Sequence, residues 1–146
     1  MSKRTISIGF LLFSMVSFLI LTIHLQNPLP QKYEELVNEF LLLRESNDNN
    51  AYDLCYFKSG YESTKCMMIE VAPILAEVKL EKTEKINDCL YAIFIRYTLE
   101  AGVTEECYSF VGTFKDTNYI FINPENIPDE LKDNYNESKF SIYRIS

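Results

Sequence analysis

The longest apolar run of the chain lies near its N-terminus, from Ile6 to Leu25. No residue in this run is charged at neutral pH when His24 is counted as neutral. A helix of about 20 residues extends about 30 Å, which matches the hydrocarbon thickness of a bilayer. Because Lys3 and Arg4 precede the run, its N-terminal end is expected to stay in the cytoplasm. The pattern predicts a membrane segment that places the following residues outside the cell or in a lumen.

An uncleaved signal-anchor and a cleaved signal peptide both fit residues 1–25. The apolar run is longer than the roughly 7 to 15 residues usual in a signal peptide, and no small-x-small pair follows it closely, which favours the anchor. Cleavage between Leu25 and Pro30 would instead give a secreted protein. Both alternatives leave a linker over residues 26–30 and a single exported domain over residues 31–146.

Beyond the linker, apolar residues at helical spacing predict a helix over residues 31–45. The polar run at residues 46–50 should end this helix, because its short side chains compete for backbone hydrogen bonds. The residues expected to form the buried stripe are Leu36, Val37, Phe40 and Leu41.

The rest of the chain is richer in β-formers and alternating patterns. The predicted strands cover residues 52–58, 64–71, 76–82, 89–99, 107–114 and 119–123, with an edge strand over 138–145. Residues 89–99 also fit a helical stripe, but their aromatic and β-branched side chains favour the strand. Turns or loops are expected at residues 59–60, 81–88, 115–118 and 124–136, the last with a short helix. The pattern predicts an α+β domain with one N-terminal helix packed on a small antiparallel sheet.

The formal net charge of −7 and the pI of about 4.8 limit the kinds of partner. Phosphate binding needs a basic stripe, and the sequence has none, so nucleic acid is excluded. The same acidity argues against peripheral binding to anionic lipid. A basic surface on a partner protein stays compatible with the charge.

All four cysteines follow the apolar run, and an even count in an exported domain predicts two disulfides. Sequential pairing, Cys55 with Cys66 and Cys89 with Cys107, is favoured because it closes short loops. The other two connectivities and four free thiols stay open as alternatives. Asn136 begins an Asn-Glu-Ser triplet that fits a glycosylation acceptor in the same compartment.

Catalytic equipment is missing from the predicted domain. The single histidine, His24, lies in the apolar run, so no imidazole is at hand for Ser-His-Asp or Cys-His catalysis. The sequence has no CxxC pair, and its four glycines form no loop that could cradle a phosphate. Residues 47–50 with Asp53 resemble part of a calcium loop but lack its central glycine and terminal glutamate. We expect no enzyme activity, no cofactor and no metal.

Several short segments resemble the cystatin/cathelin-like superfamily. They are residues 33–37, 46–48, 77–80, 87–89 and 107–110. The resemblance implies one long helix laid across an antiparallel sheet. The inhibitory Gln-x-Val-x-Gly pattern is absent near residues 67–73, and the chain has no tryptophan for the family's second wedge. The spacing between Cys66 and Cys89 also departs from the family, and residues 124–146 have no counterpart. The resemblance therefore concerns the fold more than protease inhibition.

The leading hypothesis is a non-enzymatic protein-interaction module, secreted or tethered through residues 6–25 and stabilised by two disulfides. Its partner would be another protein of unknown identity. Tyr119 and Phe121 share one face of a predicted strand and are the first candidates for the contact surface. A cystatin-type inhibitor of cysteine proteases is the first alternative. The second is a single-pass subunit of a membrane assembly, such as a viral fusion component.

Overall fold

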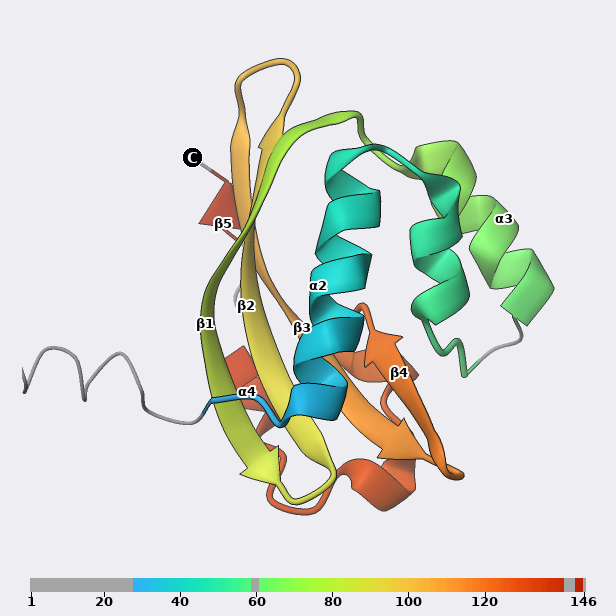
Figure 1. Ribbon diagram of the computed structural model, residues 1–146, viewed down its shortest axis with the longest axis vertical. Helices are drawn as coiled ribbons and strands as arrows, with labels where there is room; N and C mark the ends of the chain where they lie inside the picture. Colours follow the sequence, from blue (N-terminus) through green and yellow to red (C-terminus); the bar gives the residue numbers. More distant parts are fainter. Residues whose placement is uncertain (1–27, 59–60, 141–143, 146) are drawn as a thin grey trace, which may run out of the picture.

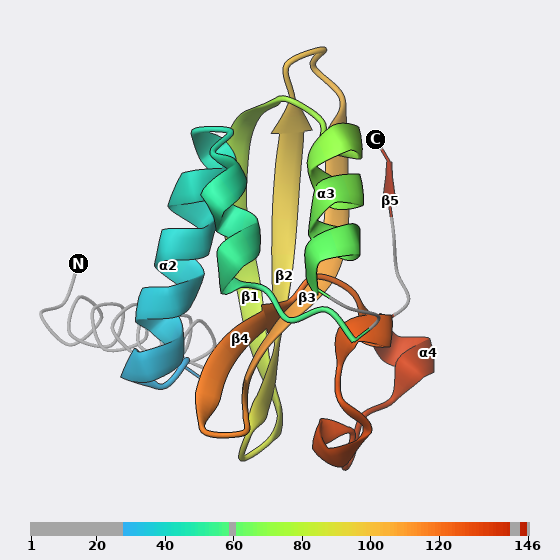
Figure 2. The ribbon, with the colours of Figure 1, turned by 90° about the vertical axis from the view of Figure 1, so that its right-hand side faces the viewer.

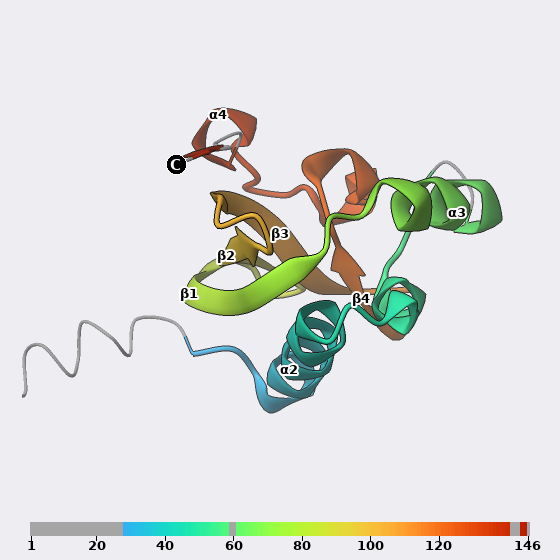
Figure 3. The same ribbon diagram turned by 90° about the horizontal axis from the view of Figure 1, so that it is seen from above.

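The computed structural model describes residues 28–58, 61–140 and 144–145. An antiparallel sheet forms the middle layer, with helices over one face and the C-terminal segment over the other (Figure 1 and Figure 3). The α+β architecture with an antiparallel sheet is as predicted. The apolar run at residues 6–25 and the predicted turn at 59–60 lie outside the described ranges.

The long helix α2 spans Gln31–Glu45, as predicted. It ends where Asn47 adopts a left-handed conformation with φ 57°, which asparagine tolerates better than most residues. Of the predicted stripe, Leu36 and Leu41 are only half-buried. The residues buried along its inner face follow a spacing of four, three and four, and they are Tyr33, Val37, Phe40 and Arg44.

The strand predicted at residues 52–58 is wrong. Its first residues belong to the 3-10 helix η1 (Asn49–Leu54), which begins where the Asp48 side chain accepts a hydrogen bond from the Asn50 amide at 2.9 Å. The capping side chain of a short polar residue thus starts a helical turn here. The β-forming residues that follow it had instead favoured a strand.

The strand predicted at residues 64–71 is also wrong, because these residues belong to the helix α3 (Tyr61–Val71). Lys65 pairs with Asp53 and so ties α3 to η1. Figure 2 shows α2 and α3 on the same face of the sheet, with η1 between them. The partly buried side chains of α3 recur at helical intervals, and they are Thr64, Lys65, Met68 and Ile69.

The sheet is an antiparallel meander in the order β1 (Leu75–Asn87), β2 (Leu90–Leu99), β3 (Thr104–Phe114) and β4 (Thr117–Phe121). β1 extends through residues 81–87, so the loop predicted there is wrong, because Lys82 and Lys85 stay paired with β2. The predicted hairpin of β3 and β4 is confirmed, but its turn holds only two of the four residues predicted at 115–118, and β4 begins two residues earlier than predicted. Its turn residues Lys115 and Asp116 have φ values of 49° and 64°, as a type I′ turn requires.

Both faces of the sheet are buried, which explains why β2 reads as a nearly continuous apolar run. On the helical face, Tyr91, Ile93 and Ile95 pack against α2 and η1. On the opposite face, Phe110 and Phe121 pack against the C-terminal segment. The alternation of β3 and β4 therefore separates two apolar cores rather than a core from solvent.

The C-terminal segment contains short elements, η2 (Pro124–Asn126), η3 (Asp129–Leu131), α4 (Glu137–Phe140) and β5 (Arg144–Ile145). The Asn87 amide holds this segment to the β1–β2 turn by donating to the carbonyls of Leu131 and Asp133 at 2.9 and 2.8 Å. The edge strand predicted for 138–145 is therefore correct only at its end, where β5 pairs with β3. None of the helices in the described ranges has the length and apolar character needed to cross a bilayer.

Candidate binding cavity

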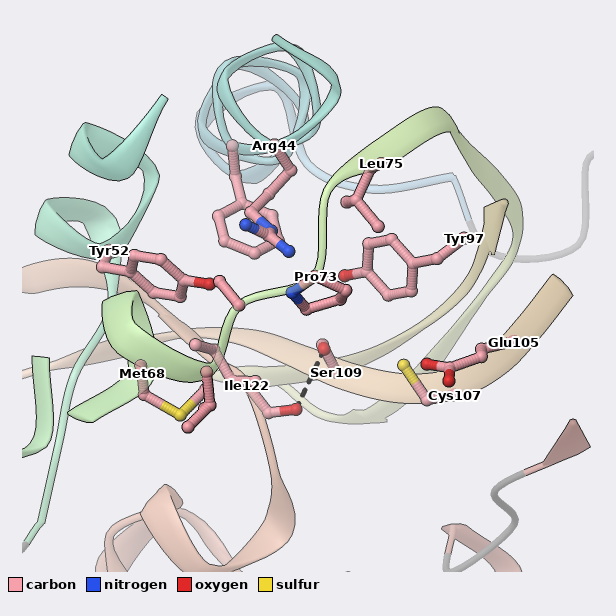
Figure 4. Close-up of a pocket in the computed structure, with 13 residues that line it drawn as sticks. Arg44, Tyr52, Met68, Pro73, Leu75, Tyr97, Glu105, Cys107, Ser109 and Ile122 are labelled. Carbon is pink, nitrogen blue, oxygen red and sulfur yellow. Dashed lines mark hydrogen bonds between the residues drawn. The ribbon is translucent and has the colours of Figure 1, made fainter. Parts of the chain in front are cut away.

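A cavity of about 230 Å³ lies between the helical layer and the sheet (Figure 4). Its walls come from α2, η1, α3, β2 and β3 and from the segment that joins α3 to β1. Apolar side chains form most of the wall. They are Phe40, Met68, Val71, Ala72, Pro73, Leu75 and Ile122.

Arg44 brings a buried positive charge to this cavity. It follows Tyr33, Val37 and Phe40 on the inner face of α2, so the helix turns its side chain away from bulk solvent. Arg44 is only 8% exposed, and Figure 4 shows its guanidinium pointing into the cavity. The guanidinium lies 5.2 Å from the ring centroid of Tyr52.

No carboxylate within the described ranges forms an ion pair with Arg44. The arginine of β2 provides the contrast. Arg96 lies 2.8 Å from a Glu81 oxygen and 2.7 Å from a Glu106 oxygen. Because a buried charge is costly without a partner, Arg44 is suited to receive an anion from outside the chain.

Two tyrosine hydroxyls face the same space. Figure 4 shows Tyr52 and Tyr97 pointing toward the middle of the cavity from opposite sides. Burial raises the pKa of Tyr97 above its usual value, and it raises the pKa of Tyr52 although Arg44 opposes the shift. Both phenols therefore stay protonated at neutral pH and can donate a hydrogen bond to a bound anion.

The other polar groups of the wall do not compete for that anion. Ser109 donates its hydroxyl to the Ile122 carbonyl at 3.0 Å. Burial raises the pKa of the Cys107 thiol to about 11, so this side chain stays neutral. Glu105 is the one acidic residue among the described residues that line the cavity.

One side of the cavity is fixed by Asn47, immediately after α2. Its amide group donates to the Leu75 carbonyl at 3.0 Å and accepts from the Leu75 amide at 2.8 Å. The preceding Ile74 carbonyl accepts from the Glu100 amide at 3.1 Å, which ties the segment to the β2–β3 turn. These bonds hold the α3–β1 connection over the cavity, while Val71 stays 69% exposed beside it.

The four cysteines are unpaired, so the predicted sequential disulfides are wrong for this structure. Cys89 accepts a backbone hydrogen bond from Thr113, whereas Cys107 lies six residues away along β3, a distance of about 20 Å. A disulfide needs Cα atoms within about 7 Å. Cys55 is buried in the core beneath α2, whereas Cys66 is exposed on α3.

Alkylation by iodoacetamide at pH 8 without reductant should distinguish these thiols in the native chain. Cys66 and Cys89 are exposed and should react first. Cys107 should react at least about tenfold more slowly, because its raised pKa leaves little thiolate, and Cys55 should react only after unfolding. Peptide mapping by mass spectrometry gives the order. Four cysteines that react only after reduction would contradict the structure and support the predicted bridges.

The other candidate residues are found at scattered places. Tyr119 and Phe121 share a face, as predicted, but Phe121 is fully buried and Tyr119 is only partly exposed. Phe121 is therefore a core residue and not a contact for a partner. Asn136, the predicted glycosylation site, is exposed just before α4. His24 lies outside the described ranges, within which no cluster of three or more potential metal ligands occurs.

Sequence reasoning missed Arg44 as a functional residue. The signal was present, since Tyr33, Val37, Phe40 and Arg44 follow one helical stripe. A charged residue at the end of an apolar stripe is usually interpreted as a solvated terminus. Only the placement of α3 and the α3–β1 connection shows that this end of the helix lines a cavity.

Comparison with known proteins assigns no family to the chain. The functional proposal therefore rests on the cavity itself. No protein-family model, curated protein or solved structure matches this sequence.

Proposed function

We propose that the chain is a non-enzymatic binding module that takes an anionic group into the Arg44 cavity. The observation that carries the proposal is the guanidinium itself, which is buried, points into a cavity and has no carboxylate partner in the described part of the chain. A cation in this position receives little electrostatic stabilisation from the protein, and an incoming anion would supply much more.

The chemistry of the lining supports binding rather than catalysis. The only histidine of the chain is His24, far from the cavity in sequence. Burial raises the pKa of both Cys55 and Cys107, which leaves these thiols poor nucleophiles at neutral pH. The cavity thus offers hydrogen-bond donors and apolar contacts, and Glu105 is the one carboxylate among its described residues, with no histidine and no activated nucleophile beside it.

The proposed place of action is the non-cytoplasmic side of a membrane. The uncharged run at residues 6–25 and the preceding Lys3 and Arg4 support either a tethered or a secreted domain. The proposed protein partner is supported by large apolar side chains on the surface, of which Val71 and Ile74 lie beside the cavity. The full set is Leu42, Met67, Val71, Ile74 and Val103.

The proposal is tested by the thermal unfolding of the full-length chain in acetate, sulfate, phosphate or phenylacetate at constant ionic strength. At least one anion should raise the unfolding midpoint, by about 3–6 °C at ten times its dissociation constant. The Arg44→Met variant should lose the shift, because the buried cation is gone.

Lys79→Met is the matched control, because it removes a positive charge from an exposed position of β1. It should keep the full shift. The proposal fails if no anion stabilises the chain, or if the Arg44→Met variant responds as the unmodified chain does.

A further inference from the structure

We infer that the ligand of the Arg44 cavity is a small organic monocarboxylate with an apolar body of about six to eight carbons. The inference rests on the proposed function and adds the chemical class of the ligand. It follows from the charge count, the hydrogen-bond donors, the volume and the apolar character of the same cavity.

The charges of the lining favour an anion with a single negative charge. Arg44 is the one basic residue and Glu105 the one acidic residue among the described residues of the wall. One cation neutralises one negative charge, and Glu105 would repel the second charge of a phosphate or sulfate dianion. The net charge of −7 on the chain adds to this repulsion at long range.

The donors match a carboxylate. The planar guanidinium of Arg44 can bind both carboxylate oxygens in a fork, which a point-charge ammonium cannot. The hydroxyls of Tyr52 and Tyr97 point toward the middle of the cavity from either side, where further lone pairs of the same group would lie (Figure 4). Neither hydroxyl has another hydrogen-bond partner in the described ranges.

The volume sets the size of the apolar part. An apolar cavity of about 150 Å³ in another protein holds benzene. The cavity beneath Arg44 has about 230 Å³, which leaves room for one carboxylate beside a six-carbon body. Acetate would leave most of that space unfilled, and only part of a long-chain fatty acid would fit within it.

The rest of the wall is mostly apolar. Phe40, Met68, Leu75 and Ile122 provide aromatic, thioether and branched surfaces in contact with the cavity. A ring or short alkyl chain placed there loses its water without leaving polar groups unpaired. A sugar or a polar amino acid of the same size would bring hydroxyls or an ammonium into contact with this surface, so these classes are disfavoured.

The decisive experiment is a calorimetric titration of the full-length chain with phenylacetate, acetate, phenylacetamide and inorganic phosphate at constant ionic strength. Phenylacetate should bind at least about tenfold more tightly than acetate, because the ring is buried. Its affinity should also be at least about tenfold higher than that of phenylacetamide, its neutral analogue, and than that of phosphate. The Arg44→Met substitution should lower the affinity for phenylacetate by at least about tenfold, and Lys79→Met should leave that affinity unchanged.

Glu105→Gln gives an independent measurement that does not depend on the stability of an Arg44 variant. Removing this carboxylate should increase the affinity for phenylacetate by about two- to fivefold. It should increase the affinity for phosphate more, because repulsion grows with ligand charge.

N-acetylphenylalanine presents the same ring and carboxylate on a peptide backbone. It should bind more weakly, since the apolar wall offers no partner for its added amide.

The outcomes separate the two proposals. If acetate or phosphate binds through Arg44 and phenylacetate binds no more tightly, the ligand class is wrong while the binding function stands. Tighter binding of N-acetylphenylalanine would likewise overturn the small-acid assignment in favour of a protein C-terminus. If no anion binds in an Arg44-dependent manner, both proposals fall.

Discussion

Replacing Phe121 with alanine is expected to lower the free energy of unfolding by about 3–5 kcal/mol. Phe121 is fully buried in the core beneath the C-terminal segment, and its ring centroid lies 6.0 Å from that of Tyr56. The ring packs directly over Gly112 of the neighbouring strand, since a Cβ added there would lie 3.3 Å from Phe121 Cε2, and its removal therefore leaves a cavity. Urea unfolding followed by circular dichroism measures the change.

Tyr119→Ala is the matched control, since Tyr119 occupies the same face of β4 two residues earlier and is partly exposed. It should cost only about 1–2 kcal/mol, because less apolar area leaves the core. Equal stability of the Phe121→Ala variant and the unmodified chain would contradict the structure. It would restore the sequence-based interpretation of Phe121 as a surface residue that contacts a partner.

Replacing Arg44 with methionine is expected to raise the free energy of unfolding by about 1 kcal/mol or more in the absence of ligand. The side chain is 8% exposed and has no carboxylate partner in the described ranges, so its desolvation is not offset by an ion pair. Methionine keeps much of the volume and packs against the same apolar wall. The loss of the contact with the Tyr52 ring opposes the gain by about 0.5–1 kcal/mol.

Arg96→Met is the control for this stability measurement, because Arg96 is the arginine of the sheet that has two carboxylate partners. Since that cluster is partly exposed, its loss should cost about 0–1 kcal/mol. A clear destabilisation by Arg44→Met would show that Arg44 has a structural role. Greater stability combined with lost anion binding would show that the chain keeps Arg44 for function at the expense of stability.

The helix α2 could be predicted to its ends because three local signals agree in its sequence. An apolar stripe runs along it, a proline precedes it and a polar run follows it. The hairpin of β3 and β4 was equally accessible, since the polar residues 115–118 separate two alternating segments, although the turn itself holds only Lys115 and Asp116. In both places the local preference and the tertiary structure demand the same conformation.

The helix α3 was missed for the opposite reason. Its residues include β-branched and apolar side chains, such as Thr64, Ile69 and Val71, that favour a strand in isolation. The helical period emerges only when Met68 and Ile69 are seen to pack against the core beneath α2. Tertiary contacts therefore decided between two conformations that the local sequence left nearly balanced.

The cavity could not be predicted, because it exists only where several segments that are distant in sequence meet. Arg44 comes from α2, Tyr97 from β2 and Pro73 from the α3–β1 connection. Two of its walls, η1 and α3, could not be expected because residues 52–58 and 64–71 were predicted to be strands. The predicted disulfides failed for a related reason, since residues near in sequence, such as Cys55 and Cys66, need not be near in space.

The position of a bound acid tests the central claim most directly, and isotope-filtered NMR of the full-length chain with phenylacetate measures it. The account predicts nuclear Overhauser contacts from the ring protons of the ligand to the side chains of Phe40, Met68 and Leu75, which line the Arg44 cavity. It also predicts that these contacts disappear in the Arg44→Met variant. Ring contacts confined to other parts of the surface, or contacts that persist without Arg44, would contradict it.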